Sequence, residues 1–216
     1  PDTITVFPDP VLHLKYFQQR DVYSDDPFTD EVEPSEPFAL GLMVHNTGKG
    51  AALNFKITSA QPKIIENEKG LLIDFKIIGS QVGSQQVSPS LTLDLGQIDP
   101  SDAKVGLWWL TSTLQGKFIE YTATFEHIHS LGDKHLSLID SVEIHELIHP
   151  VLADRAGDDD QPDFLANDQP DPNNLPDTIH LSDGTSAPVE VLTDGATDGA
   201  VTVNNLQVHL TATMTP

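Results

Sequence analysis

The chain has 216 residues, enough for one large β domain or for one domain and part of a second. Its 33 acidic and 11 basic residues give a formal net charge of −22. Nucleic acid and anionic membranes are therefore disfavoured as partners, because both need a basic surface. Since the sequence has no cysteine, the fold must be held by its core, its strand ladders or bound ions.

No stretch of the sequence has the length and hydrophobicity of a membrane span. The apolar runs all fall well short of the roughly 20 residues that a spanning helix needs. The chain begins at Pro1 rather than at methionine and ends at Pro216, directly after a strand-like run. We expect a mature or excised piece of a longer exported polypeptide, located outside the cell or on its surface.

Strand patterns dominate the first two thirds of the chain. Alternation of apolar and polar residues gives one apolar face to each strand, because side chains two apart point the same way. Runs richer in apolar residues, at 71–78 and 105–110, predict more deeply buried strands. The alternating segments are residues 12–16, 40–44, 53–57, 91–95, 119–125 and 142–149.

Short strands separated by turn residues predict an all-β fold, an antiparallel immunoglobulin-like sandwich over residues 1–150. Within it, residues 21–37 contain acidic residues and three prolines, and we expect a long surface loop. Residues 151–177, rich in Asp, Asn and Pro, have the composition of a linker. Residues 178–216 form a C-terminal portion of short strands, with turns at Asp183-Gly184, Asp194-Gly195 and Asp198-Gly199.

Two segments carry a resemblance to a known family. The sequence NTGKGAA at residues 46–52, followed by an alternating strand, resembles the glycine-rich hairpin of bacterial immunoglobulin-like domains of the CARDB and APHP type. The sequence LTLDLGQIDP at 91–100 resembles a later turn of the same group. The glycines would supply positive φ angles and let Ala51 and Ala52 pack closely. The resemblance implies a β-sandwich module of an exported protein, with roles in adhesion, spacing or presentation, and it implies no catalytic residues.

One motif points to an enzyme instead. His145, Glu146 and His149 satisfy the pattern H-E-x-x-H, in which two histidines on one helical face bind zinc and the glutamate activates water. Here, however, the surrounding residues 142–149 alternate with the period of a strand, and Pro150 would end a helix. In a strand the two histidines would lie about 13 Å apart. A zinc metallohydrolase is therefore the alternative to a non-catalytic module.

The acidic segment is a candidate calcium site, because Ca²⁺ prefers several oxygen ligands on a flexible backbone. Closely spaced carboxylates also repel each other, and a divalent ion would relieve that repulsion. The order of ligands matches no EF-hand, and a solvated tether is the other interpretation. The residues chosen as calcium ligands are Asp158, Asp160, Asp163 and Asp168. A second acidic patch is formed by Asp21, Asp25, Asp26 and Asp30.

Other side chains give weaker indications. His127 and His129 lie two apart in a predicted strand, where they could share a metal or simply face solvent. Exposed aromatic side chains could form a platform for a surface polysaccharide, which makes a carbohydrate-binding module the second alternative. The aromatic residues considered are Tyr23, Phe28, Trp108 and Trp109. In a strand, Trp108 and Trp109 must point to opposite faces, so one is expected in the core.

The sequence as a whole predicts a non-catalytic structural or adhesive module of a large exported bacterial surface protein or appendage. Its expected partners are neighbouring modules or copies of the same chain, which an open edge strand could join into a filament. Calcium is the cofactor that the composition favours.

Overall fold

The computed structural model describes residues 8–57, 73–117, 138–153, 159–169 and 175–189, and the backbone of 196–203 and 206–213. These residues form strands, turns and loops, and none of them is helical. The predicted all-β class is therefore confirmed. In the same part of the chain, no helix is long and apolar enough to cross a membrane.

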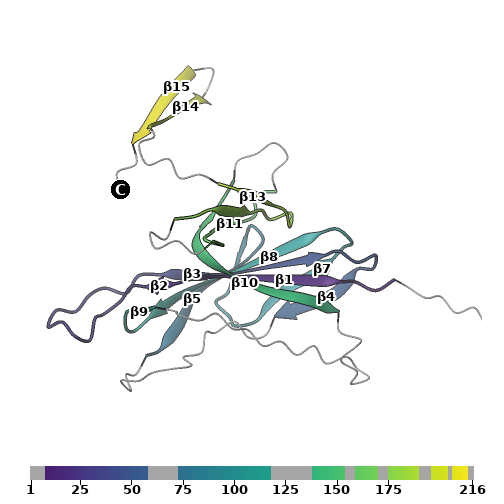
Figure 1. Ribbon diagram of the computed structural model, residues 1–216, viewed down its shortest axis with the longest axis horizontal. Helices are drawn as coiled ribbons and strands as arrows, with labels where there is room; N and C mark the ends of the chain where they lie inside the picture. Colours follow the sequence, from purple (N-terminus) through teal and green to yellow (C-terminus); the bar gives the residue numbers. More distant parts are fainter. Residues whose placement is uncertain are drawn as a thin grey trace, which may run out of the picture.

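Fifteen strands make up the described structure (Figure 1). In chain order they are β1 Leu12–Gln19, β2 Asp21–Val22, β3 Phe38–Asn46, β4 Ala52–Ile57, β5 Phe75–Val82, β6 Gln85–Val87, β7 Leu93–Ile98, β8 Ala103–Ser112, β9 Gly116–Lys117, β10 Ile139–Val151, β11 Asp163–Ala166, β12 Thr178–His180, β13 Ser186–Pro188, β14 Ala196–Val203 and β15 Leu206–Thr213. The predicted strand at 119–125, like His127 and His129, lies outside the described residues.

Nine of these strands form one large sheet in the order β13-β12-β11-β10-β1-β3-β8-β5-β6. Neighbouring strands run antiparallel except β1 and β10, which are parallel over their whole paired length. The sheet is therefore mixed, whereas the sequence predicts an antiparallel one. Parallel neighbours need a long connection. Here the chain from β2 to β9 forms the connection between β1 and β10 in the sequence.

The first face of the large sheet carries the main hydrophobic core. Alternate residues of β1 and β3, such as Leu14 and Leu42, point into it and are fully buried. The small β4–β7 sheet covers this face, with Leu93 and Ile98 among the buried residues. Trp108 is also fully buried here, and its indole N–H donates to the Ser90 carbonyl at 3.0 Å.

The second face is covered by the segment that follows β10. In Figure 1, β11 and β13 lie above the plane of β1, β3 and β8. The Phe164 ring stacks on Phe17, with 4.2 Å between ring centroids. It also lies against Gly41, where an added Cβ would come within 2.3 Å of Phe164 Cε1. A glycine is needed at this strand position because the ring occupies the space of a side chain.

This packing corrects the interpretation of residues 151–177 as a linker. The segment contains β11, in which Asp163, Phe164 and Ala166 are buried. Because β11, β12 and β13 extend the same hydrogen-bonded sheet as β10, the sheet continues past residue 150, where the sequence predicts a boundary. Acidic composition concealed the strand, since the carboxylate of Asp163 is itself buried and hydrogen-bonded to backbone.

The glycine-rich turn at 46–52 is organised by the buried side chain of Asn46. Its Oδ1 accepts hydrogen bonds from the N–H groups of Val11 and Gly48, at 3.1 and 3.0 Å. Its Nδ2 donates to the carbonyls of Gly50 and Ile98, at 2.8 and 3.1 Å. One side chain thus joins the start of β1, the turn and the end of β7.

The expectation of positive φ angles at Gly48 and Gly50 is wrong. The glycines with positive φ in the described residues are Gly83, Gly96 and Gly184. Gly48 and Gly50 are required for close approach instead. Added Cβ atoms would lie 2.4 Å from the Val11 nitrogen and 1.8 Å from the Pro8 carbonyl oxygen, respectively.

The turn predictions after residue 177 had mixed outcomes. Asp183-Gly184 is a turn, with Gly184 N–H donating to the Leu181 carbonyl at 2.9 Å and a φ of +89°. Asp198-Gly199 was predicted as a turn but lies inside β14, which pairs with β15 in a two-stranded sheet of its own. The turn predicted at Asp194-Gly195 lies outside the described residues.

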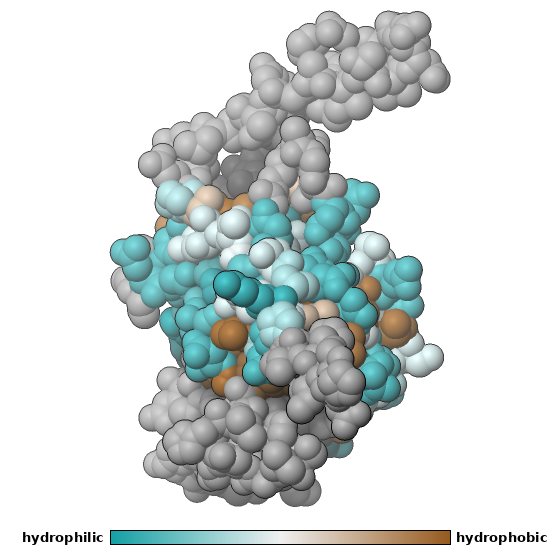
Figure 2. Space-filling view, turned by 90° about the vertical axis from the view of Figure 1, so that its right-hand side faces the viewer, coloured by the Kyte–Doolittle hydropathy of each residue, from teal (hydrophilic) through white to brown (hydrophobic). Residues whose placement is uncertain are grey.

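The acidic segment 21–37 is largely a surface loop, as predicted, although β2 pairs with β9 at its start. Its carboxylates bind its own backbone. Glu33 accepts from the Asp26 N–H at 3.0 Å and from the Thr29 hydroxyl at 2.9 Å. These two hydrogen bonds lower the pKa of Glu33. Among the coloured residues in the view of Figure 2, most are hydrophilic and the hydrophobic ones are scattered.

Candidate functional site

The H-E-x-x-H motif lies within β10, so its backbone is extended and not helical. The extended conformation predicted for residues 142–149 is confirmed. At the strand rise, His145 and His149 are about 13 Å apart, and the pairing with β11 is irregular between Leu147 and His149. His145 is partly buried, whereas His149 is exposed. The two histidines therefore do not face a common ion as they would in a zinc hydrolase.

The glutamate of the motif is bound by two other side chains. Glu146 is only 6% exposed, and its Oε2 forms an ion pair with Arg20 Nη2. The same oxygen accepts a hydrogen bond from Asn167 Nδ2 at 3.3 Å. Glu146 Oε1 and Asn167 Oδ1 are buried and find no hydrogen-bond partner among the residues that the structure describes. The carboxylate is therefore committed to a buried ion pair and is not positioned to activate water.

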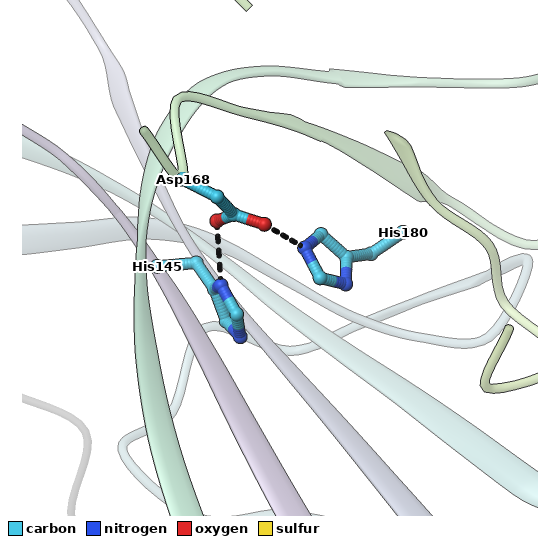
Figure 3. A group of neighbouring side chains, drawn as sticks. All are labelled: His145, Asp168 and His180. Carbon is cyan, nitrogen blue, oxygen red and sulfur yellow. Dashed lines mark hydrogen bonds and ion pairs between the residues drawn. The ribbon is translucent and has the colours of Figure 1, made fainter. Parts of the chain in front are cut away.

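His145 instead belongs to a cluster with Asp168 and His180 (Figure 3). Its Nδ1 lies 2.7 Å from Asp168 Oδ1, and His180 Nε2 lies 2.8 Å from Asp168 Oδ2. The two imidazole rings are 4.3 Å apart between centroids. Figure 3 shows the carboxylate bridging the two rings, with one oxygen directed to each. Among the described residues, these three form the one His/Asp/Glu group with the spacing of metal ligands.

Three separate segments supply the cluster. His145 comes from β10 and points to the second face of the sheet, next to Phe17 in register. His180 ends β12 and is paired with Phe164 of β11. Asp168 follows β11 and is held by Asp177, whose carboxylate oxygens accept from the N–H groups of Asp168 at 3.1 Å and Gln169 at 2.7 Å.

Aromatic packing fixes the two imidazoles. Phe17 stacks on His145, with ring centroids 5.2 Å apart, and contacts His180 at 5.1 Å. The side chain of His180 is only 4% exposed and that of His145 is 15% exposed, compared with 25% for Asp168. The rings are therefore largely shielded from water, and a polar group placed between them would be held rigidly.

The neighbouring charges define which ring nitrogens carry protons. Burial tends to raise the pKa of Asp168, but the hydrogen bonds from His145 and His180 outweigh it and lower the pKa. As an anion, Asp168 can only accept, so each imidazole donates an N–H to it. Lys15 Nζ lies 3.4 Å from His180 Nδ1 and donates to it. His145 Nε2 is buried and has no hydrogen-bond partner among the described residues, and Glu143 Oε2 lies 3.4 Å from it.

The four predicted calcium ligands do not meet in the described structure. Asp158 lies outside it, and Asp160 is exposed, with a φ of +55°. Asp163 is fully buried, and its two oxygens accept from the backbone N–H groups of Ser182 at 2.7 Å and Ala153 at 2.9 Å. Asp168 joins the histidines. The sequence places its carboxylate in the predicted calcium site, whereas in the structure it contacts His145 and His180.

The second acidic patch is likewise bound to its surroundings. Asp25 Oδ1 accepts from the Glu33 N–H at 3.1 Å, and Asp26 Oδ1 accepts from the Phe28 N–H at 3.0 Å. Asp21 forms an ion pair with Lys117 at 3.6 Å, and Asp30 is exposed. These contacts organise the loop locally.

Trp108 cannot belong to the predicted aromatic platform, because it is fully buried and cannot contact a sugar. Trp109 is partly buried against the second core cluster, so the predicted opposite orientation of the two tryptophans is confirmed. Tyr23 and Phe28 remain exposed, at 60% and 68%.

No family model, curated protein or solved structure matches this chain.

His180 is the member of the site that sequence reasoning missed. The sequence predicts its strand, at 178–181, but nothing in that short segment connects it to His145. The connection depends on β11, which places β12 beside β10 and which the acidic composition concealed.

Proposed function

We propose that this chain is a non-catalytic structural or adhesive module with an immunoglobulin-like sandwich as its main part, belonging to a large exported bacterial surface protein. One observation carries the proposal: Glu146, the would-be catalytic base of H-E-x-x-H, is buried in an ion pair with Arg20. The motif thereby becomes part of a strand that joins two layers of the fold. Glycine-rich turns and two covered sheet faces are also what such modules use for rigidity.

The proposed module joins its neighbours through the β14–β15 hairpin. Within the described residues this hairpin is hydrogen-bonded to no other strand. A lone two-stranded hairpin is marginally stable in water, so it gains from pairing with another chain. The sequence of β15 has apolar residues at alternate positions, Leu206, Val208 and Leu210. The edges of the large sheet are less suitable, because β6 and β13 are short and β13 ends in Pro188.

The test is the association state of the full chain. Analytical ultracentrifugation over a range of concentrations should detect self-association of the wild type. Val208→Pro should reduce it by removing a donor from the ladder of β15. Gln86→Pro in the short edge strand β6 is the matched control and should associate like the wild type. Wild-type chains that stay monomeric at high concentration would contradict assembly through the hairpin.

Carbohydrate binding is a second candidate, supported by two exposed aromatic side chains in one organised loop. Tyr23 and Phe28 flank the backbone that Asp26 and Glu33 hold by hydrogen bonds. Binding of a surface polysaccharide should weaken in the variant Tyr23→Ala and in Phe28→Ala, without a change in melting temperature. Calcium binding by the acidic segment stays a prediction, which calcium-dependent melting would test.

A further inference from the structure

The cluster of His145, Asp168 and His180 combines two features that its hydrogen bonds alone leave unexplained. It gathers two imidazoles and a carboxylate from three separate segments into one largely shielded space. Within the described part of the chain, it also leaves His145 Nε2 buried with no hydrogen-bond partner. We propose that these three residues bind a divalent transition-metal ion of the Zn²⁺ type, which fixes the segment after β10 to the large sheet.

The donor set and its spacing fit such an ion. Imidazole nitrogens and carboxylate oxygens bind Zn²⁺ at about 2.0–2.2 Å, which places neighbouring ligands of a tetrahedral site about 3.3 Å apart. One ligand atom from each residue lies within 4.8 Å of the other two. The observed N–O separations of 2.7 and 2.8 Å mean that the ligands must open by about half an ångström. Three protein ligands would leave the fourth position to water.

The unpartnered nitrogen of His145 is accounted for by this binding mode. When Nδ1 binds the metal, the imidazole proton moves to Nε2, so that no net proton is lost from the ring. Glu143 Oε2, 3.4 Å from Nε2 and on the same face of β10, then becomes the acceptor for that proton. A carboxylate in this place is a common support for a metal-bound histidine, because it fixes the tautomer and the ring orientation.

Lys15 opposes the metal at the other histidine. With His180 Nε2 on the metal, Nδ1 must carry the proton, yet Lys15 Nζ donates to this same nitrogen at 3.4 Å. Lys15 must therefore turn away when the ion enters, and its positive charge also repels the ion. Lys15 thus lowers the affinity of the site, and a neutral acceptor at this position would raise it.

The ligand atoms of the cluster determine which cation it should bind. Imidazole suits Zn²⁺, Ni²⁺ and Cu²⁺, whereas Ca²⁺ prefers an all-oxygen site. The proposed site contains two nitrogens and one carboxylate, so Zn²⁺ should bind there and Ca²⁺ should not. Metal binding at this cluster does not depend on what the proposed module attaches to.

The experiment uses the full chain stripped of metal by a chelator. Titration calorimetry and thermal melting are carried out with Zn²⁺ and with Ca²⁺, and Co²⁺ absorption reports the ligand geometry. The wild type should bind one Zn²⁺ and melt at a higher temperature with it. His180→Ala and Asp168→Ala should each weaken binding at least tenfold. His149→Ala is the matched control, since this exposed histidine of the same strand should leave affinity unchanged.

Lys15→Gln provides a second arm that does not depend on removing a ligand. This variant keeps a side chain of similar length, supplies an acceptor for His180 Nδ1, and should bind Zn²⁺ several-fold more tightly. The proposal is overturned if His180→Ala still binds Zn²⁺ like the wild type, or if His149→Ala loses as much affinity as His180→Ala. It is also overturned if Lys15→Gln binds Zn²⁺ more weakly than the wild type, or if Zn²⁺ leaves the melting temperature unchanged.

Discussion

The contact between Phe164 and Gly41 can be changed by a substitution at either residue. It therefore tests how the segment after β10 packs on the second face of the large sheet. Phe164 is fully buried, and its replacement by alanine should lower the free energy of unfolding by about 3–5 kcal/mol. Gly41→Ala adds a methyl group that would lie 2.3 Å from Phe164 Cε1. Ordinary carbon contacts are about 3.5–4.0 Å, so the ring must move, at a cost of about 1–3 kcal/mol.

The double variant distinguishes a direct contact from two independent defects. If the effects were additive, Gly41→Ala with Phe164→Ala would destabilise by about 4–8 kcal/mol. Since the alanine at 164 leaves room for the new methyl group, the double variant should lose no more than Phe164→Ala alone. The coupling energy should therefore be about 1–3 kcal/mol.

The assay is urea unfolding followed by fluorescence of Trp108 and Trp109, which lie on the two faces of the sheet. Gly116→Ala is the control, because nothing lies within 4 Å of the added Cβ. It should leave stability nearly unchanged. Additivity of the two core substitutions to within about 0.5 kcal/mol would refute the packing of β11 on this face.

Three further predictions concern other parts of the fold. Asn46→Ala should lower the free energy of unfolding by more than about 3 kcal/mol in urea, because two N–H groups and two carbonyls lose their partner, whereas exposed Lys49→Ala should be nearly neutral. Glu146→Gln should lower the free energy of unfolding by about 2–4 kcal/mol, because it leaves the charge of Arg20 uncompensated. The double variant Arg20→Met with Glu146→Met should recover much of this lost stability. Equal losses of stability in the single and double variants would contradict the ion pair. Burial raises the pKa of Tyr16 from 10.0 to about 12, so stability that is complete below pH 10 should fall by about 2–3 kcal/mol as the pH rises to 12. Tyr16→Phe should remove this alkaline decrease, and an unchanged decrease would show that another group causes it.

The sequence was informative wherever a strand exposes one face and buries the other. Leu12, Leu14 and Tyr16 alternate with polar neighbours, and β1 has the predicted position and face. The alternation of apolar and polar residues did not reveal β11. There the sheet is covered on one side, and a polar side chain is buried because it makes hydrogen bonds. Asp163 has the appearance of a solvated residue, but its carboxylate is satisfied by two backbone N–H groups that only the folded chain brings near.

The candidate site shows the same limit more strongly. His145 and Asp168 were both selected from the sequence, but in two different motifs with two different metals. What joins them to His180 is the pairing of β10, β11 and β12, a long-range feature that has no local pattern. A motif such as H-E-x-x-H defines chemistry only on the helix that places its residues together, and here a strand separates them.

Hydrogen exchange of the backbone amides in β11 measures whether residues 163–166 form a buried strand of the large sheet. We expect the amides of Phe164, Leu165 and Ala166 to exchange as slowly as those of β3, together with the Ser182 amide that donates to Asp163. Exchange of these amides within seconds, at the rate of a solvated linker, would contradict it.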